Sequence, residues 1–327
     1  MPANLTQQYY AAEEACKKAS TYEEKLAALE EMLATVPKHK GTEKIQAEIK
    51  KRLSRMRKED GQTQGGGSRQ EDPFLIDAQG AGQVLLLGHP NSGKSALVQT
   101  LTNAKTQVAE YPFATVLPIP GMMKHEDVSI QLVDTPPFVL DGIPGNFSSA
   151  IRNSHMLGLV LDLTDPDCID HLTTMLEYLR EKRILREEVP EGVRALTLDK
   201  VLILGNKADL TDWDEIVEMI EELVPDCPTI VPVSAVTGFN LDQFRALVFE
   251  RLQVIRVYTK RPGKKPDLER PFVLPVNSTV SDLAHSIHKD IADNLRTAKV
   301  WGSAKFDGQA VNHDYVLADR DIVELND

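Results

Sequence analysis

The stretch Gly88-His-Pro-Asn-Ser-Gly-Lys-Ser95 decides the fold of the central part of the chain. It follows the apolar run Val84-Leu-Leu-Leu87 and precedes a stretch with helical spacing. A strand, a glycine-rich loop and a helix in this order form a P-loop, in which backbone amides and the helix N-terminus face phosphate oxygens. We therefore expect a nucleotide phosphate site that is lined by Gly88, Asn91, Ser92, Gly93, Lys94, Ser95 and Ala96.

The same loop predicts a Mg²⁺ site. Lys94 is expected to hold the β- and γ-phosphates, and the hydroxyl of Ser95 to coordinate the ion. Asp134 follows an alternating apolar strand and is placed to hold Mg²⁺ through water. Thr115, in Tyr111-Pro-Phe-Ala-Thr115, is the candidate switch threonine, whose hydroxyl reaches Mg²⁺ only when the γ-phosphate is present. The expected catalytic residues are Lys94, Thr115 and Asp134, and the expected metal ligands are Ser95, Thr115 and Asp134.

A P-loop alone also suits an ATPase or a metabolic kinase, so the base-reading residues decide the nucleotide. Asn206-Lys-Ala-Asp209 follows the apolar run at 201–204, and the Asp209 carboxylate can accept hydrogen bonds from guanine N1 and its exocyclic amine. Adenine lacks that pair of donors and would leave the carboxylate unpaired. Asn206 steadies the loop, and the Lys207 stem lies over the ring. Ser234-Ala235 is the last guanine-binding element, so we expect GTP and GDP as ligands.

The surrounding sequence alternates short apolar runs with helical stretches. Further apolar runs lie at 157–161, 201–204 and 230–233. Such runs are typical of strands that are buried on both faces of a mostly parallel sheet. The fold class is therefore α/β, and we expect the GTPase domain at 81–258, closed by an amphipathic helix at 241–257.

The N-terminal region, 1–60, is predicted to be a helical hairpin. Leu26, Leu29 and Leu33 recur at helical spacing after a candidate capping box, and a second apolar stripe runs from Ile45 to Met56. Lys44, Lys51, Arg55 and Lys58 line the opposite face of the second helix. This basic face is either simply solvated or an RNA-facing surface. A Gly/Ser/Gln-rich flexible linker follows at 61–80.

The C-terminal region begins after a basic linker at 259–270 and forms a small α+β module at 271–327. We expect strands at 272–276, near Val300 and at 321–324, with one helix at 281–294. The module is too short for a second enzyme core.

Composition narrows the class of protein. The net charge of −12 argues against a surface that is basic throughout, although it leaves local patches open. No apolar run approaches the roughly 20 residues needed to cross a bilayer, and nothing reads as a secretory signal. The 3 cysteines lack metal-ligand spacing and suit reduced thiols. We therefore expect a cytoplasmic protein without a membrane partner.

Three motifs resemble those of the Obg group of GTPases. They are Tyr111-Pro-Phe-x-Thr115, the P-loop and Asn206-Lys-Ala-Asp209. The stretches 37–44, 257–260 and 299–302 resemble the developmentally regulated GTP-binding (DRG) branch. The resemblance covers nearly the whole chain. It implies that the C-terminal module is a TGS domain of β-grasp fold and that the chain associates with the ribosome or structured RNA.

Two departures bear on catalysis. The family usually has Gly at Pro137, where a backbone amide contacts the γ-phosphate, and proline has no N–H to donate. Phe138 stands where many GTPases place a water-orienting glutamine, although the Obg group also carries an apolar residue there. We expect slow hydrolysis that a protein partner or a cation accelerates; the alternative is a GTP-binding adaptor with negligible hydrolysis. Asn91 either helps to bind K⁺ or only shapes the loop.

Overall fold

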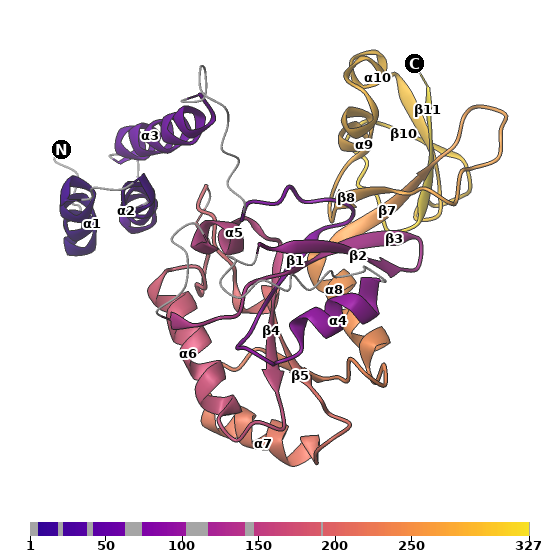
Figure 1. The fold of residues 1–327 in the computed structure, drawn as a ribbon. Coiled ribbons are helices and arrows are strands. Elements are labelled where there is room, and N and C mark those ends of the chain that lie inside the picture. The colour runs from indigo at the N-terminus through magenta and orange to yellow at the C-terminus, as the bar shows by residue number, and fades with distance from the viewer. Residues whose placement is uncertain are drawn as a thin grey trace. The chain divides into compact units, whose positions relative to one another are not determined.

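The computed structural model describes residues 6–18, 22–37, 42–62, 74–102, 117–140, 147–190 and 192–326. They belong to two compact units (Figure 1). One comprises Met1–Asp72 with Arg186–Ala195, and the other comprises Pro73–Leu185 with Leu196–Asp327. None of the described helices is long and apolar enough to cross a membrane.

The described part of the first unit is helical. Its helices are α1 (Gln7–Lys18), α2 (Tyr22–Thr35) and α3 (Glu43–Gln62). Leu29 and Leu33 of α2 share one buried core with Ile49 and Leu53 of α3, as their helical spacing indicates. The sequence predicted only two helices; α1 is a third, and it adds Tyr9 to the core. The candidate capping box and Met56 lie outside the described side chains.

The segment Arg186–Ala195 completes this helical unit, although it lies between two elements of the other unit. Val193 is 8% exposed and joins the core of the three helices. Arg186 Nη2 lies 3.4 Å from Glu31 Oε2 of α2. An apolar contact and an ion pair thus attach this segment to the helices.

The second unit contains two sheets. The first has the order β2-β3-β1-β4-β5-β6, and its strands are parallel except for β2; Figure 1 labels β1 to β5. This confirms the predicted mostly parallel sheet. The strand bounds are β1 Gln83–Leu87, β2 Ile119–His125, β3 Val128–Asp134, β4 Met156–Asp162, β5 Val201–Asn206 and β6 Thr229–Pro232.

Helices cover both faces of this sheet because its central strands are apolar on both sides. Leu85 and Leu87 of β1 pack in a core with α5, α6 and α7, whereas Val84 and Leu86 pack with α4 and α8. The helix bounds are α4 Lys94–Thr102, α5 Phe147–Asn153, α6 Cys168–Glu181, α7 Trp213–Leu223 and α8 Leu241–Leu252. The sheet is therefore the middle layer of three, and the carboxyl ends of its parallel strands share one edge.

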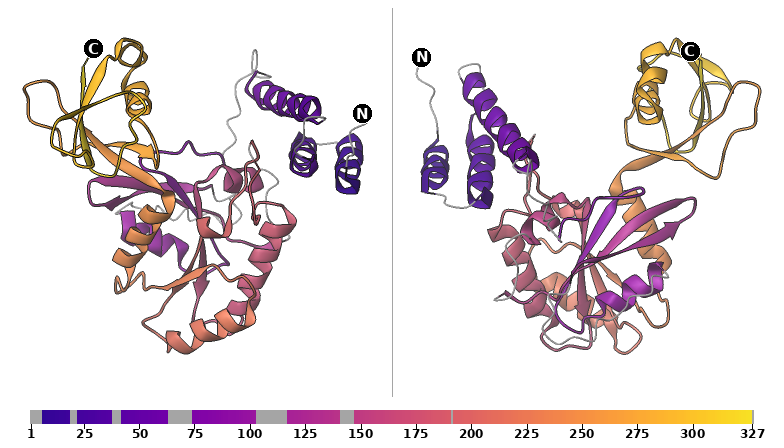
Figure 2. Two further views of the ribbon diagram at one scale, coloured as in Figure 1. Left: turned by 180° about the vertical axis from the view of Figure 1, so that it is seen from behind. Right: turned by 45° about the horizontal axis from the view of Figure 1, so that its top comes forward.

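The second sheet has the order β10-β9-β11-β7-β8, with β7 parallel to β11. Two short helices pack on it and share its apolar core (Figure 2). The bounds are β7 Val254–Thr259, β8 Phe272–Pro275, α9 Val280–Ile287, α10 Lys289–Asn294, β9 Thr297–Trp301, β10 Gln309–Val311 and β11 Asp321–Asn326.

Two helix predictions were wrong. The helix expected at 241–257 ends at Leu252, because Gln253 adopts a left-handed φ of 54° and the next residues form β7. That strand pairs with β8 and β11, so the expected end of the GTPase domain at 258 falls within the second sheet. The helix expected at 281–294 is interrupted by the extended backbone of His288, whose ring accepts a hydrogen bond from the Asp290 amide at 3.1 Å.

Candidate nucleotide-binding site

The P-loop connects β1 to α4 and requires glycine at two positions. Gly93 has a φ of 89°, and a Cβ there would lie 2.1 Å from the Asn206 Nδ2 atom. A Cβ on Gly88 would lie 2.4 Å from the Val160 carbonyl oxygen of β4. Asn91 also has a positive φ, of 64°. The loop can therefore adopt this conformation only with glycine at positions 88 and 93, as the P-loop pattern predicts.

Lys94 is the first residue of α4 and its ammonium lies inside the loop. The residue is 6% exposed, and Nζ donates hydrogen bonds to the carbonyl oxygens of Gly88 at 2.7 Å and His89 at 3.2 Å. Burial lowers the pKa of Lys94 to about 8, although Asp134 opposes this shift. Among the described residues its hydrogen-bond partners are carbonyl oxygens, and a buried cation at this position is suited to phosphate oxygens.

Asp134 ends β3 opposite Leu86 of β1, so its carboxylate lies beside the P-loop. Burial raises its pKa, and a hydrogen bond from Ser95 together with the charge of Lys94 opposes that shift. Asp134 Oδ1 is buried and has no hydrogen-bond partner among the described residues. A buried carboxylate oxygen without a partner, next to a serine hydroxyl, fits the oxygen ligands that Mg²⁺ prefers. Thr115, the expected third ligand, lies outside the described residues.

Asn206 ends β5 and joins the phosphate side of the site to the guanine side. Its Nδ2 donates to the Ser92 carbonyl oxygen at 2.9 Å, and its Oδ1 accepts from the Ala235 amide at 3.1 Å. Thr100 of α4 adds a hydrogen bond to the Ala235 carbonyl oxygen at 2.9 Å. Asn206 and Ser234 are 3% and 0% exposed, so these contacts are shielded from water. The structure thus brings together three segments that the sequence predicted for one site.

Lys207 and Asp209 follow Asn206 at the same edge of the sheet. Asp209 is exposed, so its carboxylate is open to the base that it is predicted to read. Lys207 has a φ of 64°, and its ammonium is hydrogen-bonded to Asp162 at the end of β4. Thr164 donates to the other oxygen of Asp162 from both its amide, at 3.0 Å, and its hydroxyl, at 2.6 Å. Sequence reasoning missed Asp162; its position at the carboxyl end of an apolar strand was the available signal.

The segment after Asp134 packs onto the P-loop. Phe138 is 0% exposed, and its amide donates to the Gly88 carbonyl oxygen at 2.9 Å. Its ring centroid lies 5.3 Å from that of Tyr178 and 5.5 Å from that of His89. Pro137 is exposed beside it. The position where many GTPases place a water-orienting side chain is therefore a core position in this protein.

The P-loop, Asp134 and the Asn206-Lys-Ala-Asp209 motif lie at one edge of a mostly parallel sheet, and together they define the class of protein: a P-loop GTPase that binds guanine nucleotides. Residues 83–190 match the family of 50S ribosome-binding GTPases, and residues 255–326 match the TGS domain. The chain thus combines a GTPase segment with a C-terminal TGS domain, and it is similar over most of its length to proteins named as developmentally regulated GTP-binding proteins.

Relatives align along most of the chain. It is 29% identical over 366 residues to the Arabidopsis thaliana "Developmentally-regulated G-protein 3", covering 94% of this chain and 99% of that protein. It is 27% identical over 368 residues to the Saccharomyces cerevisiae "Ribosome-interacting GTPase 1", again covering 94% and 99%. Because 368 aligned positions exceed the 327 residues of this chain, that relative contains residues that this chain lacks.

The structure of the Schizosaccharomyces pombe YchF GTPase has a similar fold. Its TM-score is 0.53 at 13% sequence identity, and the match covers 77% of this chain and 99% of that one. At this identity the likeness concerns the fold alone. It agrees with the predicted combination of a P-loop GTPase domain and a C-terminal TGS domain.

Proposed function

We propose that this protein is a slow GTPase whose bound nucleotide controls its docking to the ribosome or another structured RNA assembly. The observation that carries the proposal is the position of Phe138, which is fully buried and hydrogen-bonded to the P-loop backbone at Gly88. This contact fastens the segment after Asp134 to the phosphate cradle. A phenyl ring cannot orient water, so the segment is better suited to switching than to fast hydrolysis.

We assign the following roles to the residues around the phosphates. Lys94 would hold the β- and γ-phosphates, and Ser95, Asp134 and Thr115 would hold Mg²⁺, directly or through water. Mg²⁺ supplies positive charge against the phosphate oxygens when it is bound. The Asp209 carboxylate would select guanine, while Asn206 keeps the base-reading loop on the P-loop. Asp209→Asn should therefore reduce the preference for GTP over ATP, and unchanged selectivity would instead support a kinase-like ATP site.

The proposal also includes stimulation of GTP hydrolysis by a protein partner or a cation. Because neither Pro137 nor Phe138 can assist the attacking water, added charge must come from a protein partner or a cation. Asn91 is an exposed loop residue with a positive φ, in a position to help hold K⁺ near the phosphates. Turnover should then be faster in KCl than in NaCl, and Asn91→Ala should abolish the difference. Equal turnover in the two salts would remove the K⁺ role.

Ribosome docking is supported by the yeast relative, whose name describes a ribosome-interacting GTPase. It is also supported by α3, where Lys44 and Lys51 are exposed on the face opposite the buried Ile49 and Leu53. Docking at cytoplasmic ribosomes would place the protein in the cytoplasm.

Co-sedimentation with ribosomal subunits tests docking most directly, in GDP and in a non-hydrolysable GTP analogue. We expect more protein in the ribosomal fraction with the GTP analogue. Absence from every ribosomal fraction with both nucleotides would contradict the docking proposal. Lys44→Gln/Lys51→Gln should weaken co-sedimentation and make it less sensitive to salt, because fewer phosphate contacts remain. Lys17→Gln on α1 is the matched control.

A second candidate is a GTP-binding adaptor with negligible hydrolysis. Pro137 favours it, because the residue offers no amide to the γ-phosphate. Such a protein would still bind GTP and change partners with the nucleotide, but it would release no phosphate with or without ribosomes.

A further inference from the structure

The hairpin formed by β2 and β3 runs from the nucleotide site to the TGS domain. At its open end Ile119 pairs with Asp134, the candidate Mg²⁺ residue. Thr115, the other candidate, precedes Ile119 by only a few residues in the sequence. At its closed end His125 pairs with Val128, and Glu126 and Asp127 form the turn. One continuous ladder therefore connects the magnesium site to this turn.

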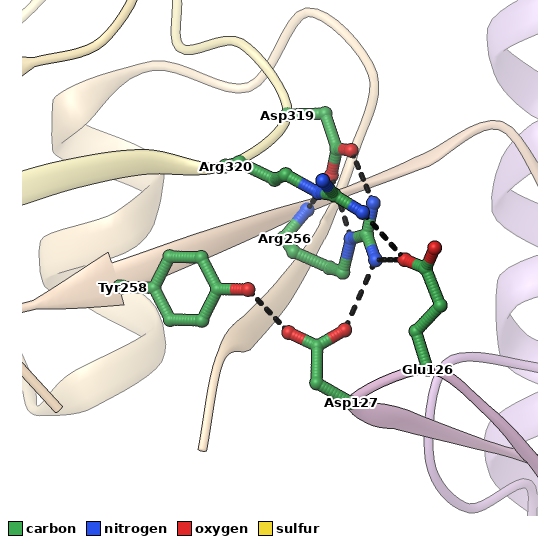
Figure 3. Close-up of polar contacts among 6 residues, drawn as sticks. All are labelled: Glu126, Asp127, Arg256, Tyr258, Asp319 and Arg320. Atoms are coloured by element: carbon green, nitrogen blue, oxygen red, sulfur yellow. Dashed lines mark hydrogen bonds and ion pairs between the residues drawn. The ribbon is translucent and has the colours of Figure 1, made fainter. Parts of the chain in front are cut away.

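The turn is bound to a buried arginine of the TGS domain (Figure 3). Arg256 lies on β7 and its side chain is 5% exposed. Its Nη1 contacts both turn carboxylates, Glu126 and, at 3.0 Å, Asp127. Its Nε and Nη2 donate to Asp319 at 3.0 and 2.6 Å. The guanidinium is thus shared between the hairpin and the TGS domain.

Further contacts close around this arginine. Tyr258 donates its hydroxyl proton to Asp127, and Arg320 Nη2 donates to Glu126 at 2.7 Å. The Arg256 guanidinium also lies 4.8 Å from the ring centroid of Phe249 on α8. We call Glu126, Asp127, Arg256, Tyr258, Asp319 and Arg320 the hairpin latch.

The contacts of the hairpin latch should form or break together, so that the latch has two states, engaged and disengaged. A buried guanidinium is stable only while its carboxylates and aromatic neighbours remain in place, because an unpaired buried charge is costly. The hairpin is held together by its own backbone ladder, so a shift of its open end moves the turn as well. Bistable contacts of this kind convert small displacements at a ligand site into domain rearrangements.

We propose that the β2–β3 hairpin is a lever through which the GTPase domain signals the presence of the γ-phosphate to the TGS domain, by engaging or releasing the hairpin latch. Asp134 at the open end would respond to the γ-phosphate through the Mg²⁺ that it would help to hold, and Arg256 at the closed end sets the placement of the TGS domain. By reciprocity, the state of the latch changes the relative affinities for GTP and GDP. The inference requires GTP and GDP binding, but it does not depend on ribosome docking.

Distance measurements between spin labels test the lever in the full-length protein. Labels would be placed at the exposed positions Glu218→Cys on α7 and Asp307→Cys in the TGS domain, with Cys16, Cys168 and Cys227 replaced. We expect the distance distribution to differ between GDP and a non-hydrolysable GTP analogue. In Glu126→Gln/Asp127→Asn the two distributions should coincide.

Asp242→Asn provides the matched control, since it removes a 97% exposed carboxylate of the same domain outside the latch. This variant should keep the nucleotide-dependent difference. If the double variant folds poorly, Tyr258→Phe, which removes only a hydroxyl, should reduce the difference by at least half. Identical wild-type distributions with the two nucleotides, or a full difference in the folded latch variants, would overturn the proposal.

The reciprocal measurement uses nucleotide affinity. We expect Glu126→Gln/Asp127→Asn to change the ratio of GTP-analogue to GDP affinity by at least about threefold, with Asp242→Asn unchanged. An unchanged ratio in a variant whose label distances show a released TGS domain would also overturn the proposal.

Discussion

Asn206 donates a hydrogen bond from its side-chain amide to the carbonyl oxygen of Ser92, at 2.9 Å, across 114 residues of sequence. Its side-chain oxygen accepts a hydrogen bond from the backbone amide of Ala235. One side chain therefore joins the P-loop to the loop predicted to be the last guanine-binding element. Both contacts are buried. The P-loop, the end of β5 and the loop at Ala235 are therefore held together, as expected for one preorganised site.

Asn206→Ala should weaken GTP and GDP binding equally. The substitution leaves two buried backbone groups without their partner, and each such loss costs about 1–3 kcal/mol. We expect both affinities to fall by about a hundredfold, measured by titration with fluorescent GTP and GDP analogues. Asn294→Ala in the TGS domain, which removes a side-chain hydrogen bond to the Asp290 carbonyl oxygen, is the control. Affinities near the wild-type values in Asn206→Ala would contradict this role.

Nucleotide binding should take up a proton as the pH approaches 8. Burial lowers the pKa of Lys94 to about 8, and bound phosphates raise it again. Well below pH 8 the ammonium is already protonated, so binding takes up no proton. As the pH rises through 8 the nucleotide-free protein loses the proton, and affinity should fall about fivefold from pH 8 to 9.

Calorimetry in buffers of different ionisation enthalpy measures this proton uptake. At pH 8 we expect about half a proton per nucleotide bound, and close to none at about pH 6.5. Equal uptake at the two pH values, or affinity that rises with pH, would show that Lys94 is not the titrating phosphate ligand.

Asp162→Asn should weaken the binding of both GTP and GDP, by a smaller factor than Asn206→Ala. Asp162 holds the ammonium of Lys207, whose side-chain stem is expected to lie over the guanine ring. Lys207 is about one-third exposed, so solvent screens the pair and its contribution is modest. We expect a loss of about three- to tenfold for GTP and GDP alike. Asp165→Asn, which alters a neighbouring carboxylate paired with His171, should have little effect; an equal loss in both variants would argue against a specific role for Asp162.

Phe138→Gln should destabilise the protein without accelerating hydrolysis. The ring is fully buried among Tyr178 and the apolar core, so the substitution removes packing and buries an amide. We expect about 3–5 kcal/mol lower free energy of unfolding, as for other large core truncations. Urea denaturation measures this, and Val139→Gln at the 48% exposed neighbouring position is the control. A stable Phe138→Gln variant with faster turnover would refute the assignment of Phe138 to the core.

Much of the GTPase domain could be predicted because its chemistry lies in short motifs at strand ends. Gly88 to Ser95, Asp134 and Asn206 were expected at one sheet edge, and the structure brings them together. For Asp162, its place at the carboxyl end of an apolar strand indicates the sheet edge but not its partner. Its contact with Lys207 depends on the adjacency of β4 and β5, which the local sequence does not reveal.

Other features depended on long-range pairing as well. Residues 254–257 extend the apolar pattern of α8, so periodicity alone assigned them to the helix, whereas pairing with β8 and β11 makes them part of a strand. Arg256 and Glu126 are 130 residues apart, and no motif connects them. Tertiary contacts override local propensity at such positions.

The most direct test of the account is phosphate release from GTP at saturating protein, measured with and without ribosomes. The account predicts slow release by the protein alone and a clear acceleration by ribosomes, with GTP bound in both cases. No release in either condition, with GTP demonstrably bound, would contradict a GTPase switch and support the adaptor instead.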